Sequence, residues 1–124
     1  MRNAATKPPY DLAERTKQFA LRAIRLCRAL PSTRECDVIG RQLLRAATSV
    51  GANYRAARRA RSAAEFRAKM GIVEEEVDEA LYWIELLVEG AIVKQERLAP
   101  LQREANELAA ITVASIKTSK AHRS

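Results

Sequence analysis

The arginines of this sequence are the residues whose type and spacing most clearly indicate a binding site. Between residues 41 and 61, four arginines recur at positions i, i+4, i+14 and i+18 of one expected helix, and two more extend the series. Guanidinium groups along one helix face can bind successive phosphates of a nucleic-acid backbone. Such contacts give affinity that does not depend on the nucleotide sequence. The candidate ligands of RNA or DNA are Arg41, Arg45, Arg55, Arg58, Arg59 and Arg61.

The same arginines have a possible partner within the chain. Residues 34–61 carry seven Arg and two acidic residues, whereas residues 72–89 carry seven acidic residues and no basic one. Composition alone slightly favours a solvated arginine face, or one paired with the acidic segment, over a phosphate track. In a protein-interaction scaffold, the pairs would form across subunits. Their members would be Arg41, Arg45 and Arg59 on one side and Glu75, Glu79 or Glu85 on the other.

The residue types that enzymes need are sparse. His122 is the only histidine, which removes Ser-His-Asp and Cys-His catalysis and the histidine ligands of helical di-iron sites. The acidic residues at 74–76, 78 and 79 point in different directions on a helix, so they do not form a metal cage. No Gly-rich phosphate loop is present. We therefore expect no enzymatic activity, no cofactor and no metal.

Composition indicates a single cytoplasmic domain. The chain has 124 residues and a formal net charge of +7, which suits an anionic partner but also plain solubility. Cys27 and Cys36 show no CxxC spacing, so a reduced, cytoplasmic protein is the simpler interpretation. No signal peptide is visible, and no apolar run reaches the roughly 18 residues of a membrane span.

The positions of helix-starting and helix-ending residues predict an all-α protein. We expect a disordered segment at 1–10, one bundle domain at 11–117 and a basic tail at 118–124. The expected helices run from about 11 to 30, 37 to 60, 63 to 89 and 99 to 117. Asp11 and Ser62 are N-caps, Gly90 is a stop, and Pro100 lies in a first turn. Short connections then predict an antiparallel, up-down-up-down four-helix bundle.

Two features of the expected helices concern packing. Gly51 inside the second helix costs about 1 kcal/mol relative to Ala, which suggests that another helix approaches closely there. The third helix is apolar on more than one side, and three other helices cannot cover both sides. We therefore expect a homo-oligomer. Its interface would contain Ile72, Glu75, Glu79, Tyr82, Trp83 and Leu86.

The ordered set of short motifs between Asp11 and Glu89 resembles the four-helix bundle proteins of the 23S rRNA intervening-sequence family. The residues that carry the resemblance are Asp11-Leu12, Arg15-Thr16, Phe19-Ala20, Leu30-Pro31, Gln42-Leu43, Arg45 to Val50, Ala52-Asn53-Tyr54, Ser62, Glu65-Phe66, Lys69, Glu76, Asp78-Glu79 and Tyr82-Trp83. The fourth helix carries little of it.

The resemblance implies a small antiparallel bundle that assembles into a ring, as a homopentamer. The family is tied to ribosomal RNA by gene location, which is not evidence of binding. A related bundle is the accessory subunit of diversity-generating retroelements, where a basic barrel is thought to hold nucleic acid and reverse transcriptase. Nucleic acid and a protein partner thus both remain possible.

Overall fold

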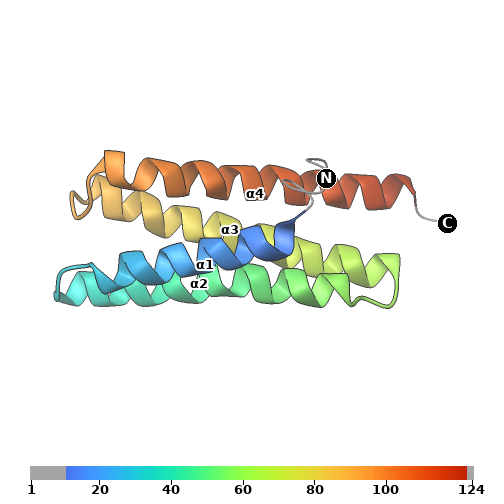
Figure 1. The fold of residues 1–124 in the computed structure, drawn as a ribbon, viewed down its shortest axis with the longest axis horizontal. Helices are drawn as coiled ribbons and strands as arrows, with labels where there is room; N and C mark the ends of the chain where they lie inside the picture. Colours follow the sequence, from blue (N-terminus) through green and yellow to red (C-terminus); the bar gives the residue numbers. More distant parts are fainter. Residues whose placement is uncertain (1–10, 123–124) are drawn as a thin grey trace, which may run out of the picture.

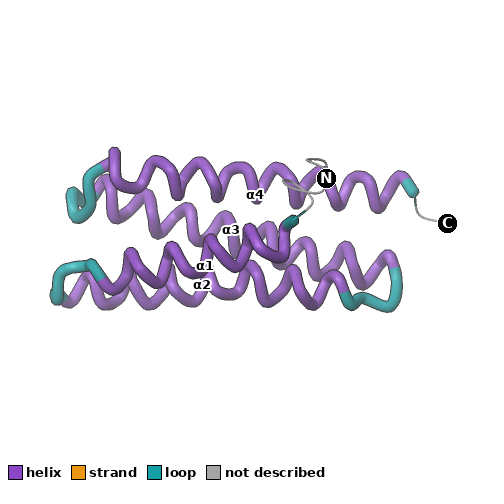
Figure 2. Tube along the Cα trace, viewed as in Figure 1, coloured by secondary structure: helices purple, strands orange, loops and turns teal. Residues whose placement is uncertain are grey.

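The computed structural model describes residues 11–122, and this part of the chain consists of helices joined by short loops. The helices are α1 (Leu12–Arg28), α2 (Arg34–Arg58), α3 (Ala63–Glu89) and α4 (Gln95–Ala121). Each loop turns the chain back, so consecutive helices lie side by side and run in opposite directions (Figure 1). Between residues 11 and 122 no strand is formed (Figure 2). The prediction of an all-α four-helix bundle is confirmed.

The core consists of apolar side chains from all four helices. Phe19, Leu43, Ile84 and Leu108 are each 1% exposed or less, and they represent α1, α2, α3 and α4 in that order. Burying one such side chain stabilises the fold by about 1.5–3 kcal/mol. The α2–α3 contact is the most extensive and the α1–α4 contact the least. Because α1 has only 17 residues against 25 to 27 in the others, it covers only part of the bundle's length (Figure 1).

Gly51 marks a close approach of α1 to α2. A Cβ atom at Gly51 would lie 3.2 Å from the Thr16 Oγ1 atom, which is tighter than an ordinary contact. Thr16 is itself buried, and its hydroxyl donates to the Leu12 carbonyl oxygen at 2.7 Å, so no polar group is left unpaired. The close helix approach expected from this glycine is confirmed.

The helix starts follow side-chain capping. The Asp11 carboxylate accepts from the Glu14 amide, and the Ser62 hydroxyl accepts from the Glu65 amide, as predicted. The expected start of the second helix near residue 37 was too late: α2 begins at Arg34, because Thr33 accepts from the Cys36 amide at 3.2 Å.

The third helix ends where the sequence predicted, at Glu89 with Gly90 as its C-cap. The residue with positive φ is Ala91, which follows the cap, and the Ile92 amide donates to the Leu87 carbonyl oxygen at 2.9 Å. These contacts form a Schellman motif, which satisfies the last carbonyls of the helix.

The expected start and end of the fourth helix were both wrong. It begins at Gln95 and continues to Ala121, rather than spanning residues 99 to 117. Pro100 therefore lies beyond the first turn, where its missing amide costs one backbone hydrogen bond. Leu98 and Leu101 are 3% and 4% exposed, and their burial on either side of the proline offsets that cost. The division into a domain and a tail stays a prediction, and its segment 1–10 lies outside the described residues.

Candidate nucleic-acid interface

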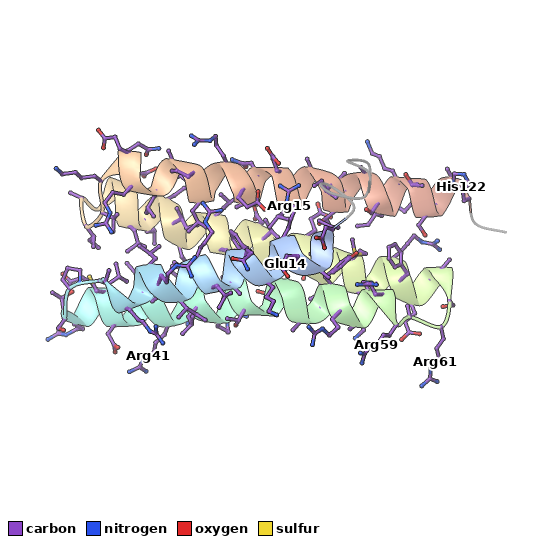
Figure 3. The ribbon with its side chains drawn as sticks, viewed as in Figure 1. Glu14, Arg15, Arg41, Arg59, Arg61 and His122 are labelled. Carbon is purple, nitrogen blue, oxygen red and sulfur yellow. The ribbon has the colours of Figure 1, made fainter. Side chains whose placement is uncertain are left out.

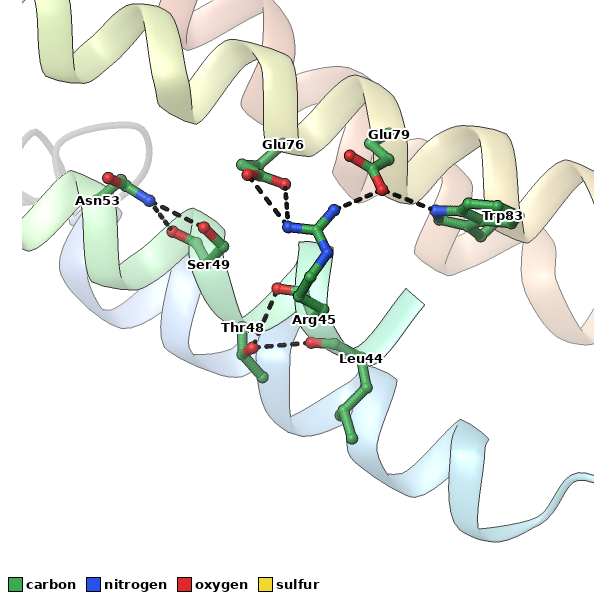
Figure 4. A network of polar contacts seen from close by, with 8 residues as sticks. All are labelled: Leu44, Arg45, Thr48, Ser49, Asn53, Glu76, Glu79 and Trp83. Carbon is green, nitrogen blue, oxygen red and sulfur yellow. Dashed lines mark hydrogen bonds and ion pairs between the residues drawn. The ribbon is translucent and has the colours of Figure 1, made fainter. Parts of the chain in front are cut away.

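Arg45 is held between two carboxylates of the neighbouring helix. Its Nη1 atom donates to both carboxylate oxygens of Glu76 at 3.3 Å, and its Nη2 atom forms an ion pair with Glu79 (Figure 4). Glu79 in turn accepts a hydrogen bond of 3.1 Å from the Trp83 indole nitrogen. The hydrogen bonds from Arg45 and Trp83 lower the pKa of the Glu79 carboxyl, and those with Glu79 and Glu76 raise the pKa of Arg45. Arg45 therefore connects α2 to α3.

Arg41 has a weaker partner on its own helix. Its guanidinium lies 2.8 Å from the Asp37 carboxylate, and the two side chains are 77% and 59% exposed. Such an exposed pair contributes only about 0.3–0.5 kcal/mol, so a phosphate can replace the carboxylate at little cost. Arg41 points away from the rest of the bundle on the same side as Arg59 and Arg61 (Figure 3).

Four arginines gather at the C-terminal end of α2 and in the following loop. They are Arg55, Arg58, Arg59 and Arg61, here called the open arginine group, and all four are exposed. Within residues 11–122, none of their guanidinium groups forms an ion pair with a carboxylate. Arg41 and Arg59 are 18 positions apart, which corresponds to roughly 27 Å along a helix. The structure thus separates Arg45, which pairs with α3, from Arg41, Arg59 and Arg61, which point outward (Figure 3), and from Arg55 and Arg58, which border α1.

One basic residue near this group was missed in the sequence. Lys17 of α1 lines a cavity of about 380 Å³ together with Arg55 and Arg58, and Tyr54 lines the same cavity. Burial raises the pKa of the Tyr54 hydroxyl, which therefore remains a neutral donor at physiological pH. The signal that could have identified Lys17 is Gly51, because the close approach of α1 at that glycine brings Lys17 beside the arginines of α2.

Arg15 shows the same arrangement as Arg45 at another helix pair. Its guanidinium contacts Glu104 at 2.6 Å and Glu107 at 2.7 Å, and the Arg15 and Glu104 side chains are only 17% and 18% exposed. The hydrogen bond to Glu104 is the main cause that raises the pKa of Arg15. This group ties α1 to α4 and is not available to a ligand.

The residues predicted for an oligomer interface share the outer side of α3. Tyr82 is 52% exposed, and its ring stacks edge-on against Trp83 with the ring centres 5.0 Å apart. Ile72 and Leu86 are half-buried and Glu75 is exposed, whereas the Glu79 carboxylate is bound by Arg45. A single chain leaves this aromatic and aliphatic surface partly open to solvent.

Two further observations concern metals and membranes. In the part of the chain that the structure describes, His, Cys, Asp and Glu side chains nowhere gather in a group of three that could hold a metal ion. Among the helices of residues 11–122, none combines the length and the apolar character of a membrane span. The Asn53 side chain donates to the Ser49 carbonyl oxygen at 2.9 Å, so this hydrogen bond stays within α2 (Figure 4).

Fold and site together define a small helical bundle with an open basic surface on one helix and a partly apolar surface on the next. The chain belongs to the 23S rRNA-intervening sequence protein family, whose model matches residues 10–114. It is similar to a crystal structure, at 1.70 Å resolution, of a protein of unknown function from the S23 ribosomal protein family of Bacteroides thetaiotaomicron VPI-5482. That similarity has a TM-score of 0.80 and 31% identity, and covers 85% of this chain and 97% of the other. The comparison with curated proteins gives no match.

Proposed function

We propose that this protein is a non-enzymatic, homo-oligomeric accessory protein that binds RNA or DNA through its basic surface with little sequence preference. The observation that carries the proposal is the open arginine group, whose four guanidinium groups lack a carboxylate partner within residues 11–122. Arg41 extends this surface along α2, and Lys17 widens it toward α1. We assign Arg45 to helix pairing instead.

The geometry of the surface favours phosphates over bases. Arginine offers planar, paired donors that match phosphate oxygens, and neutralising each phosphate releases a counterion. Arg55 and Arg58 stand in the last turn of α2, where the negative end of the helix dipole tolerates positive charge without a bound anion. The bundle can therefore present these arginines before a nucleic acid arrives. Tyr54 supplies one aromatic ring beside them, which is too little for base reading.

Assembly is the second part of the proposal. We propose that the outer side of α3, with Tyr82, Trp83 and Leu86, contacts another copy of the chain in a ring, as the family resemblance to a homopentamer implies. The support is the exposure of a large aromatic side chain beside half-buried apolar ones. A ring would repeat the open arginine group around its circumference and lengthen the phosphate track. The cytoplasm suits such a protein, because both cysteines are free thiols.

A protein-interaction scaffold is the alternative, and one observation favours it. Arg45 already shows that α2 and α3 pair through opposite charges, although within one chain. If neighbouring copies pair in the same way, the exposed acidic residues of α3 cover the open arginine group. The protein partner, such as a reverse transcriptase, would then bind elsewhere on the ring.

The test compares binding of a structured ribosomal RNA fragment at several salt concentrations by fluorescence anisotropy. The proteins are the natural chain, the variant R55Q/R58Q/R59Q/R61Q, and the control R34Q/R103Q/K117Q/K120Q, which removes the same charge from exposed positions elsewhere. We expect the first variant to reduce the slope of log K against log salt by about three, since each phosphate contact contributes about 0.7–0.9. The control should keep the slope of the natural chain.

Two results would refute nucleic-acid binding through this surface. One is a natural chain that fails to bind RNA and DNA even at low salt, and the other is a control that loses as much slope as the variant. The assembly is tested separately by light scattering. The variant W83E/L86E should be monomeric, whereas V38E, at an exposed apolar position of α2, should keep the oligomer. An unchanged oligomer in W83E/L86E would refute the interface.

A further inference from the structure

A second arginine cluster lies between α1 and α4, on a different part of the molecule from the open arginine group. Arg22 and Arg25 of α1 and Arg97 of α4 line a cavity of about 190 Å³. Leu26, Leu98 and Leu101 form the rest of its lining, and the last two are buried. Three arginine side chains from two helices therefore border one small space together with three leucines.

No carboxylate forms an ion pair with these arginines in the part of the chain that the structure describes. The residues three and four positions away along the chain contain no acid: Gln18, Phe19, Leu21, Leu26, Arg28, Ala29, Val93, Lys94, Pro100 and Leu101. Elsewhere along the same helix pair, Arg15 has two glutamates. The contrast shows that α1 and α4 can pair opposite charges, and that at this cavity they bring like charges together.

The position of Arg97 adds a second unfavourable interaction. Arg97 stands in the first turn of α4, where the helix dipole is positive and disfavours a cation, and the acidic residue of that turn, Glu96, forms no ion pair with it. Lys94, the N-cap residue of α4, provides no side-chain hydrogen bond to the helix. The α1–α4 contact is also the least extensive of the helix contacts in the bundle. An anion in the cavity would offset both the repulsion among the arginines and the unfavourable interaction of Arg97 with the helix dipole.

We propose that Arg22, Arg25 and Arg97 form a binding site for a phosphate group carried by a monoester or present as the free ion. Arginine forks match phosphate oxygens, and the doubly charged monoester gains more from three cations than a singly charged diester does. The cavity is smaller than the roughly 300–1,000 Å³ of typical small-molecule sites, so it suits a phosphate group rather than a whole nucleotide. This site goes beyond the proposed function and does not depend on it.

Inorganic phosphate is the first probe, measured by titration calorimetry in a low-salt buffer without other multivalent anions. The variants are R97Q and the control R103Q, which changes an exposed arginine of the same helix. We expect phosphate to bind the natural chain and R103Q alike, and to bind R97Q about tenfold more weakly or worse, since one charge-assisted contact is lost. Equal binding to all three proteins, or no binding to the natural chain, would overturn the proposal.

Thermal unfolding gives an independent measurement. Without phosphate, R97Q should melt at a higher temperature than the natural chain, because the substitution removes both the repulsion and the unfavourable dipole interaction. With phosphate, the natural chain should gain stability and R97Q should not. A melting temperature lowered by R97Q in the absence of phosphate would contradict the electrostatic basis of the site.

The source of the phosphate is distinguished by three further ligands. Equal affinity for inorganic phosphate and adenosine monophosphate indicates that the phosphate group alone is recognised. Tighter binding of a 5′-phosphorylated oligonucleotide than of its 5′-hydroxyl form, lost in R97Q, identifies a nucleic-acid end as the source. Salt-dependent binding of the 5′-hydroxyl form to the open arginine group should be unaffected by R97Q, so the two proposals can fail separately.

Discussion

Two sets of arginines in this bundle differ in what the facing helix offers them. Arg15 and Arg45 each bind two glutamates that stand three positions apart, Glu104 with Glu107 on α4 and Glu76 with Glu79 on α3. The open arginine group at the end of α2 meets no such pair within residues 11–122. The same side chain therefore holds helices together in one place and remains available to a ligand in the other.

The role of each arginine in this bundle therefore depends on the side chains that the neighbouring helix places opposite it. Two glutamates at i and i+3 lie on the same face of a helix, so one guanidinium can reach both. An arginine opposite such a face becomes part of the fold. An arginine directed to solvent keeps its charge unbalanced and attracts anions over a distance of about 10 Å at 0.1 M salt.

A substitution in the core should have the largest effect on the free energy of unfolding. Leu43→Ala removes a fully buried side chain and should lower the free energy of unfolding by about 2–5 kcal/mol, measured by urea denaturation. The control Val38→Ala, at a position that is 53% exposed on the same helix, should change it by less than about 0.5 kcal/mol. A loss below about 1 kcal/mol for Leu43→Ala would mean that α2 is rotated differently.

The partly buried ion pairs come next. Arg15→Ala leaves the Glu104 carboxylate, 18% exposed, without its partner, and should cost about 1–3 kcal/mol of unfolding free energy. Arg41→Ala, which removes an exposed pair with Asp37, should cost about 0.3–0.5 kcal/mol. Similar losses in the two variants would remove the distinction between arginines that hold helices and arginines that do not.

The smallest expected effect depends on pH. Since Arg45 and Trp83 lower the folded-state pKa of Glu79, its contribution is fully present above the unfolded value of about 4.3 and is lost as the pH falls through the lower folded value. Solvent screening limits the contribution to at most about 1 kcal/mol. Glu79→Gln should therefore destabilise the protein at pH 7 and by progressively less as the pH falls below about 4.3, measured by chemical denaturation against the exposed control Glu75→Gln. A pH-independent loss would mean that Glu79 acts through packing.

The sequence predicted the helices well because their signals are local. Asp11 and Ser62 cap the helices that they were expected to start, and Gly51 lies at a close approach of two helices. The start of α4 was predicted wrongly because Pro100 was expected to lie in a first turn. In the structure the helix begins earlier, and the burial of Leu98 and Leu101 offsets the hydrogen bond that the proline cannot donate. Local signals thus fail where packing across the bundle supplies the larger free energy.

The arginine surface was predicted less completely because it depends on how helices are turned toward one another. Arg45 shares its helix face with Arg41 in the sequence pattern, yet in the structure it pairs with Glu76 and Glu79 of α3. Lys17 joins the surface from another helix, which no spacing within α2 reveals. The interface around Tyr82 and Trp83 stays a prediction, because one chain contains no second copy to contact.

The most direct test of the account compares Arg45→Gln with Arg61→Gln, which remove the same charge from the two settings. Each variant is measured for its free energy of unfolding and for the salt dependence of RNA binding. We expect Arg61→Gln to reduce the slope of log K against log salt by about 0.7–0.9 without loss of stability, and Arg45→Gln to lose stability while keeping the slope. Equal loss of slope in both variants would show that the carboxylates of α3 do not separate arginines that bind from arginines that hold the fold.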